Sequence, residues 1–250
     1  MLGSLKKYLA DWKNSLAVFF TGLLFLSLRV IFCRITIKHI KEITVAWKAA
    51  FADSGFITKL IVSTILLSIV LFFLANYLPY NETRPGSTLH DPLLETFEPI
   101  DLTWISFVLI YGALIIGLSA LAKFPRSVLI AFQSYALLAS LRLITIHFLP
   151  LNAPPAIIPM EDPFVAFFGG GKTLLKDLFF SGHTSTMFLL ALTAQNKYLK
   201  LSFVICTILI GATVLAQHVH YTIDVIAAPF FAYTTYRIAH LINKEKKLSV

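Results

Sequence analysis

Six apolar stretches, each close to the length of a bilayer-spanning helix, constrain the fold of this chain more than any other feature. A membrane helix needs about 20 apolar residues. The stretches cover residues 57–79, 102–122, 127–149, 182–196, 200–217 and 220–240. Only 14% of the 250 residues are charged and 57% are hydrophobic, which excludes a water-soluble fold. We therefore predict an all-α integral membrane protein whose core is a six-transmembrane-helix bundle.

The chain divides into three parts on this prediction. Residues 57–241 form the six-span domain, and residues 242–250 form a basic cytoplasmic tail. Residues 1–56 form an N-terminal hydrophobic and amphipathic extension, in which residues 16–32 are a further apolar run. Basic residues crowd the end of that run, and a seventh span would send the first lysines to the wrong side of the membrane. We expect the extension to be cytoplasmic or to lie in the interface.

Charge distribution predicts the orientation of the bundle. The turns after the second and fourth spans and the C-terminal tail are basic, whereas the loop at 81–101 is rich in acids. The positive-inside rule then puts both ends of the bundle in the cytoplasm. This orientation also explains the net charge of +8, so the expected partner is the lipid bilayer and not nucleic acid. The oligomeric state is left open.

The fourth span opens with the sequence Ser181, Gly182, His183, Thr184. A serine is a favoured N-cap, and a glycine beside it leaves the N–H groups of the helix end accessible. Such an end, with its positive dipole, is a natural seat for a phosphate group. We therefore take Ser181 and Gly182 as substrate-binding candidates.

The sixth span opens with His220 and Asp224, four residues apart, which places both on one face of a continuous helix. The carboxylate would hold one ring nitrogen of His220 and leave the other free to attack phosphorus. The orientation puts this pair at the same exterior face as His183, which could protonate the departing alcohol. Arg142, near the exterior end of the third span, is a candidate cation for the phosphoryl oxygens; a snorkelling arginine is the alternative.

Other interpretations of these residues stay open. The His–Asp pair could link two helices without any chemistry. A metal site could be built from His183, His218, His220 and Asp224, although His218 and His220 point to different faces of a continuous helix. Residues 169–173 lack the first glycine of a phosphate loop and no strand precedes them, so we interpret them as a flexible loop in which Lys172 could meet a substrate.

Two segments resemble a known family. Residues 177–184 and 220–225 look like the two catalytic motifs of the sphingomyelin synthase-like branch of the type 2 phosphatidic acid phosphatase (PAP2) superfamily, and Arg142 with Thr145 is similar to a weaker signature of that branch. The resemblance implies a six-span fold, a site facing the lumen or periplasm, and a phosphohistidine intermediate. It also implies that His220 is the nucleophile, Asp224 its orienting partner, and His183 the general acid and later base. Asp177 occupies the place of a supporting acid.

Departures from the family pattern bear on the substrate. Lys176 and Pro229 stand where the branch has a glycine and an aromatic residue, so the identity of the transferred headgroup is left open. Val214 stands where the lipid phosphatases of the wider superfamily have an arginine. We therefore expect transfer of a phospho-headgroup from a glycerophospholipid donor to a lipid alcohol acceptor such as ceramide. A phosphatase acting on phosphatidate, a sphingoid phosphate or an isoprenoid diphosphate is the alternative, and a non-catalytic scaffold or transporter is a third.

None of these chemistries requires a metal or an organic cofactor. The expected location is a bacterial inner membrane with the active site facing the periplasm, and a Golgi or endoplasmic reticulum membrane is the alternative.

Overall fold

The computed structural model describes residues 38–160 and 174–244, and the apolar run at 16–32 lies outside the described residues. The chain falls into two compact units, residues 1–49 and 50–250. Residues 38–51, which belong to the N-terminal extension predicted from the sequence, are helical. The candidate site lies in the second unit.

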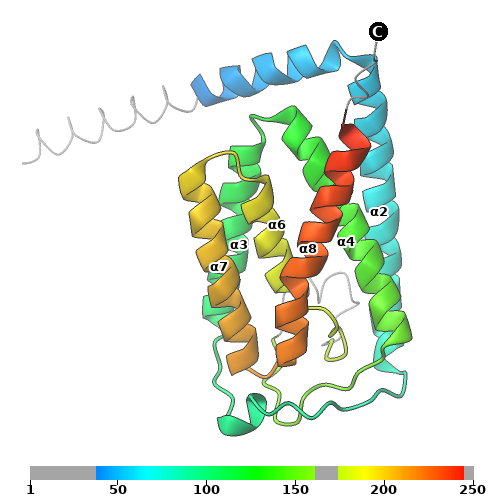
Figure 1. Cartoon of the computed structure of the whole chain (residues 1–250), viewed down its shortest axis with the longest axis vertical. Coiled ribbons are helices and arrows are strands. Elements are labelled where there is room, and N and C mark those ends of the chain that lie inside the picture. Colours follow the sequence, from blue (N-terminus) through cyan, green and yellow to red (C-terminus); the bar gives the residue numbers. More distant parts are fainter. Residues whose placement is uncertain (1–37, 161–173, 245–250) are drawn as a thin grey trace, which may run out of the picture. The chain divides into compact units, whose positions relative to one another are not determined.

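The second unit is built on helices that run alongside one another (Figure 1). They are α2 (Ser54–Glu82), α3 (Thr103–Leu121), α4 (Pro125–Phe148), α6 (Gly182–Thr193), α7 (Lys197–Ala216) and α8 (Thr222–Asn243), with a short 3₁₀ turn, η1 (Leu94–Thr96), in the loop after α2. Each of the six helices coincides with one of the six apolar stretches of the sequence. Their start signals are local: the side chains of Asp53 and Asn196 cap α2 and α7, and α4 begins at Pro125.

Four of the helices, α2, α3, α4 and α7, are long and apolar enough to cross a membrane. This supports a multi-pass membrane protein. α6 is different, because its 12 residues span about 18 Å, less than the roughly 30 Å of a hydrocarbon core. α8 does not meet the criterion of length and apolarity either. The six predicted spans correspond to six helices, but only four of these are candidate membrane spans within residues 38–160 and 174–244.

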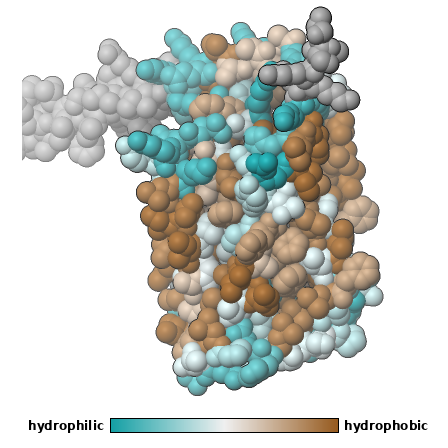
Figure 2. All heavy atoms as spheres, viewed as in Figure 1, coloured by the Kyte–Doolittle hydropathy of each residue, from teal (hydrophilic) through white to brown (hydrophobic). Residues whose placement is uncertain are grey.

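The outer surface of the bundle is apolar around its middle. Phe72, Val108, Ile115 and Ile208 are each between 65% and 72% exposed, although side chains of this kind are usually buried in soluble proteins. In Figure 2, apolar residues cover much of the middle of the visible face and hydrophilic residues gather toward its two ends. Such a surface is expected of a protein whose middle section is surrounded by lipid.

α6 occupies the centre of the bundle, where it contacts α3, α4, α7 and α8. Met187 of α6 packs with Ile210 and Val214 of α7, and all three are fully buried. On the other side of α6, Leu189 belongs to a cluster with Ala228 and Ala232 of α8. A helix enclosed by four others does not need to reach both membrane surfaces, which explains why α6 can be short.

Candidate active site

The fourth apolar stretch begins as the sequence predicted. Ser181 is the N-cap of α6, and its hydroxyl accepts a hydrogen bond from the Thr184 N–H at 3.4 Å. Gly182 follows, and a Cβ there would lie 2.8 Å from Nη1 of Arg142. A side chain at position 182 would therefore push the guanidinium away, so glycine is required for Arg142 to reach the start of α6.

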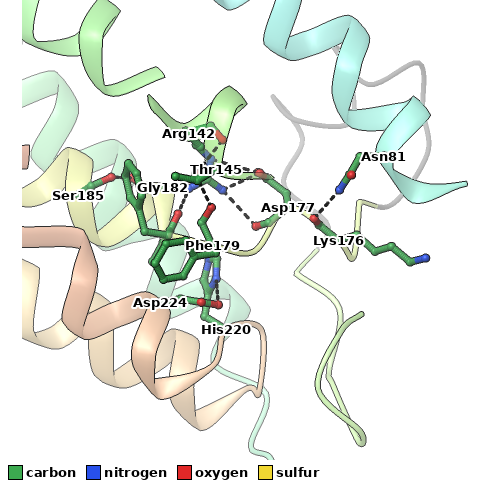
Figure 3. Close-up of polar contacts among 12 residues, drawn as sticks. Asn81, Arg142, Thr145, Lys176, Asp177, Phe179, Gly182, Ser185, His220 and Asp224 are labelled. Atoms are coloured by element: carbon green, nitrogen blue, oxygen red, sulfur yellow. Dashed lines mark hydrogen bonds and ion pairs between the residues drawn. The ribbon is translucent and has the colours of Figure 1, made fainter. Parts of the chain in front are cut away.

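Arg142 lies inside the bundle and does not extend to the surface as a snorkelling arginine would. It is 7% exposed, and Figure 3 shows its guanidinium turned toward Asp177. Nη2 lies 2.6 Å from Oδ1 of Asp177, Nε donates to the same oxygen at 3.1 Å, and Nη2 also donates to the Asp177 carbonyl at 3.1 Å. Nη1 donates to the carbonyl of Phe180. These contacts hold the segment 177–180 against α4, directly before α6 begins.

His220 and Asp224 form a buried pair, but not on a shared helix face. α8 begins at Thr222, so His220 lies in the turn before the helix and the expected i, i+4 stacking is wrong. Asp224 instead reaches back from the third helical position, where its Oδ2 accepts the Tyr221 N–H at 3.1 Å and lies 3.3 Å from Nδ1 of His220. The first N–H groups of a helix have no acceptor within the helix, and the Asp224 carboxylate at this position accepts one of them.

The buried position of this pair determines how the Asp224 carboxylate acts on the His220 ring. His220 is 2% exposed and Asp224 is fully buried, and Oδ1 of Asp224 has no hydrogen-bond partner among the described residues. Because Asp224 faces Nδ1, the other ring nitrogen of His220, Nε2, is turned away from the carboxylate. A carboxylate held in this way fixes the tautomer of the imidazole and stabilises a positive charge on it.

The two distant motifs meet in space. The N–H of Ser181 donates a hydrogen bond to the carbonyl of Asp224 at 3.1 Å, which ties the start of α6 to the first turn of α8. Arg142 and His183 both lie close enough to His220 to act electrostatically on its ring. His183, His220, Asp224, Arg142, Asp177, Ser181 and Gly182 therefore belong to one neighbourhood. Lys172 lies outside the described residues.

A cavity of about 430 Å³ adjoins these groups. Its polar wall contains Arg142, Asp177, Gly182 and His183. The rest is largely apolar and comes from four helices: Leu74 and Leu78 of α2, Ile110, Tyr111 and Leu114 of α3, Tyr135, Leu138 and Ala139 of α4, and Met187 of α6. A cavity with one charged end and an apolar body suits an amphiphile.

The end of α2 supports the segment that carries Asp177, a contact that the sequence did not reveal. Asn81 donates to the carbonyl of Lys176 at 2.9 Å, and Oε1 of Glu82 accepts the N–H groups of Leu175 and Lys176 at 2.9 and 2.7 Å (Figure 3 shows the Asn81 bond). Asn81 is 1% exposed, so this contact is enclosed within the bundle. No local signal could have indicated this link, because its partners are more than 90 residues apart.

A second missed residue, Asp91, holds the start of α8. Its Oδ2 accepts the Thr222 N–H at 2.6 Å and its Oδ1 accepts the Thr222 hydroxyl at 2.9 Å. Partial burial acts to raise the pKa of Asp91, but the hydrogen bonds from Thr222 and from the N–H groups of Leu93 and Leu94 outweigh it and lower the pKa below the ordinary carboxyl value. Asp91 therefore caps α8 from another loop.

The described residues do not form the metal site that the sequence left open. Across residues 38–160 and 174–244, no three His, Cys, Asp or Glu side chains are arranged to hold a metal ion. His218 does not lie on a continuous helix, because α7 ends at Ala216 and His218 has the positive φ of 55° of a tight turn. Its ring packs edge-on against Phe97, with the ring centres 5.1 Å apart.

Comparison with known proteins finds a family whose match covers this part of the chain. Residues 176–241 match the family model described as PAP2 superfamily C-terminal. The matched region begins beside Asp177, includes His183, and ends after His220 and Asp224. No curated protein matches the chain. The match supports membership of the PAP2 superfamily, whose members are generally phosphatases or phosphotransferases, and thus supports an enzyme of that general kind.

Proposed function

We propose that this protein is a membrane lipid phosphotransferase, similar to sphingomyelin synthases, that moves a phospho-headgroup from a glycerophospholipid to a lipid alcohol through a phosphohistidine. One observation carries the proposal. The buried His220–Asp224 pair lies beside Arg142 and His183, and these two neighbours line the polar end of a cavity whose body is apolar. Such a cavity is suited to hold the chain of a lipid while its phosphate meets the histidines.

The first half-reaction follows from the placement of these groups. Asp224 holds Nδ1 of His220, and Nε2 attacks phosphorus. A new N–P bond forms as the P–O bond to the diacylglycerol oxygen breaks, and His183 gives its proton to that oxygen. Arg142 and the N-terminus of α6 stabilise the negative charge on the phosphoryl oxygens.

The second half-reaction reverses these roles. His183, now neutral, accepts the proton of the acceptor hydroxyl, and the oxygen attacks phosphorus. The P–O bond to the acceptor forms, the N–P bond breaks, and His220 is regenerated. With water in place of the lipid alcohol the same residues give a phosphatase, and the superfamily match is equally consistent with that runner-up.

The arrangement of the helices supports six spans in the membrane. We propose that α6 and α8 complete the bundle with the four apolar candidate spans, since α6 is sheltered by four neighbours and needs no lipid contact. The site would face the periplasm of a bacterial inner membrane, because the basic turns of the chain cluster at the opposite end.

Headgroup transfer can be tested with purified protein in mixed micelles. The substrate is a headgroup-labelled phospholipid plus ceramide, and the products are separated by thin-layer chromatography. We expect label on ceramide with the natural protein, none with His220→Ala, and unchanged transfer with His39→Ala, a matched substitution outside the bundle unit. Label released only as water-soluble product would make the protein a hydrolase, and His220-independent turnover would refute the mechanism.

A further inference from the structure

A second cavity, of about 670 Å³, lies where α2 and α4 begin and α8 ends. It is separate from the candidate active site. Arg126 in its wall and Arg142 in the active site are both on α4, sixteen residues apart, a distance of about 24 Å along the helix. Nothing in the proposed reaction uses this second cavity.

Positive charge converges on this cavity from three helices. Lys59 of α2, Arg126 of α4 and Arg237 of α8 line it, together with Lys244 directly after α8. Asp53 is the sole acid among the described residues that line it, and its Oδ1 already accepts the N–H groups of Gly55 and Phe56 at 2.9 and 3.3 Å. The positive ends of the α2 and α4 dipoles add to the field, and the negative end of the α8 dipole offsets part of it. The cavity therefore attracts anions.

The same cavity also has apolar walls that continue to the outside. Phe56, Leu129 and Ile130 contribute to the lining, and so does Leu241, which is 62% exposed. The next residue, Ile242, is 56% exposed. Figure 2 shows hydrophilic side chains near this end of the visible face with apolar side chains directly beside them. A ligand with an anionic headgroup and apolar chains would contact the cations through its headgroup and the apolar residues through its chains.

A polar link between helices fixes the walls of this cavity. The Gln133 side-chain amide of α4 donates to the hydroxyl of Ser63 on α2 at 3.0 Å and accepts a hydrogen bond from Asn243 at the end of α8. Asn243 also lines the cavity. The three helices that carry the cations are thus linked to one another by side-chain hydrogen bonds on one side of the cavity.

We propose that this cavity binds the phosphate headgroup of an anionic phospholipid, with the acyl chains lying against the outer surface of α8. The positive-inside rule accounts for basic residues at this end of the bundle, but not for their convergence around one amphipathic cavity. Lys197 and Lys200, at the start of α7, provide the contrast, because they are not among the residues that line it. If the lipid binds in this cavity, its binding should depend on Arg126 and Arg237. If the lipid is attracted only by net charge, its binding should weaken equally when Lys197 and Lys200 are neutralised.

Native mass spectrometry of the full chain can measure this, with dioleoylphosphatidylglycerol and dioleoylphosphatidylcholine as probes. We expect the natural protein to retain phosphatidylglycerol preferentially. The double variant Arg126→Gln/Arg237→Gln should bind it about tenfold more weakly, from the loss of charge-assisted hydrogen bonds to phosphate. The matched variant Lys197→Gln/Lys200→Gln, with the same change in net charge, should bind it as the natural protein does. Each variant is first checked for cooperative thermal unfolding, and Arg237→Gln alone replaces the double variant if that one is misfolded.

Three results would overturn the proposal: equal retention of the two lipids, equal weakening in both double variants, or displacement of phosphatidylglycerol by millimolar inorganic phosphate or glycerol phosphate. The last result would identify a site for soluble anions. His220→Ala should leave the lipid preference unchanged, so a failure of the proposed enzymatic function and a failure of this proposal are distinguishable.

Discussion

At the scale of single residues, the site depends on side chains whose exact chemical type matters. Arg142 makes contacts through all three of its guanidinium nitrogens, with Asp177 and with two carbonyls. A lysine has the charge but presents a single ammonium group, so it cannot reproduce this planar arrangement. Asp224 likewise serves two donors at once, the Tyr221 N–H and His220.

Replacing Arg142 with lysine should reduce turnover by about 100-fold, because it removes the planar set of hydrogen bonds to Asp177 and Phe180 that places a cation at the start of α6. The measurement is the rate of headgroup transfer at saturating lipid. Arg84→Lys is an informative comparison, since Arg84 also bonds carbonyls of α4 but lies outside the polar end of the active-site cavity. An equal loss in both variants would mean that Arg142 acts on stability alone.

Asp224→Asn should fold and yet lose activity by about 100- to 10,000-fold. The amide oxygen can still accept the Tyr221 N–H, but the neutral side chain no longer stabilises a charged His220. Single-turnover formation of the phosphohistidine, trapped at alkaline pH, is the quantity to measure. Normal trapping in the variant would show that Asp224 serves only the helix end.

At the scale of elements, helix ends and the loops that hold them position the site. α8 begins where Asp91 accepts the first N–H, and the segment before α6 is held by the end of α2 through Asn81 and Glu82. These contacts explain why residues without a role in the chemistry should still affect it.

Glu82→Ala should lower both stability and activity, because two N–H groups of the segment at 175–176 lose their acceptor. The expected loss of stability is about 1–3 kcal/mol, and Glu82→Gln, which keeps an oxygen acceptor, should lose less. Thermal unfolding and transfer rate are measured on both variants. Identical behaviour of the alanine and glutamine variants would show that Glu82 does not act through this contact.

The cap formed by Asp91 should make stability depend on acid pH. Its pKa is lowered in the folded state, so its contribution is complete above the ordinary carboxyl pKa of about 4 and is lost as pH falls through the lowered pKa. Asp91→Asn should therefore be less stable than the natural protein by about 1 kcal/mol at neutral pH, and the difference should shrink below pH 4. A difference that stays constant from pH 7 to pH 3 would contradict this assignment.

At the scale of the whole molecule, two of the cavities in the bundle lie toward opposite ends, one lined by Arg142 and His183 and one lined by cations. The active-site cavity extends along α4 from Arg142 to Tyr135, seven residues or about 10 Å deeper. Its depth should limit the length of the lipid chain that fits beside the catalytic groups.

Tyr135→Ala should therefore shift the preference of the enzyme toward longer chains, with little change in rate for short ones. The experiment compares transfer from donors that differ only in acyl length, and Tyr233→Ala, an exposed tyrosine of α8 that is not part of the cavity wall, is the matched control. An unchanged chain-length profile would exclude Tyr135 as the limit.

The sequence alone determined the positions of the six helices, because hydrophobic runs and caps such as Ser181 act between neighbours along the chain. It also predicted His183, His220 and Asp224 as candidate reactive side chains, since the chemistry on which that prediction rests is a property of residue type. Only the tertiary structure decided that His220 precedes α8, that Arg142 pairs with Asp177, and that Glu82 and Asp91 hold the site. Those contacts join segments that are distant in the chain, and their formation depends on how the helices pack and where each helix end finds an acceptor.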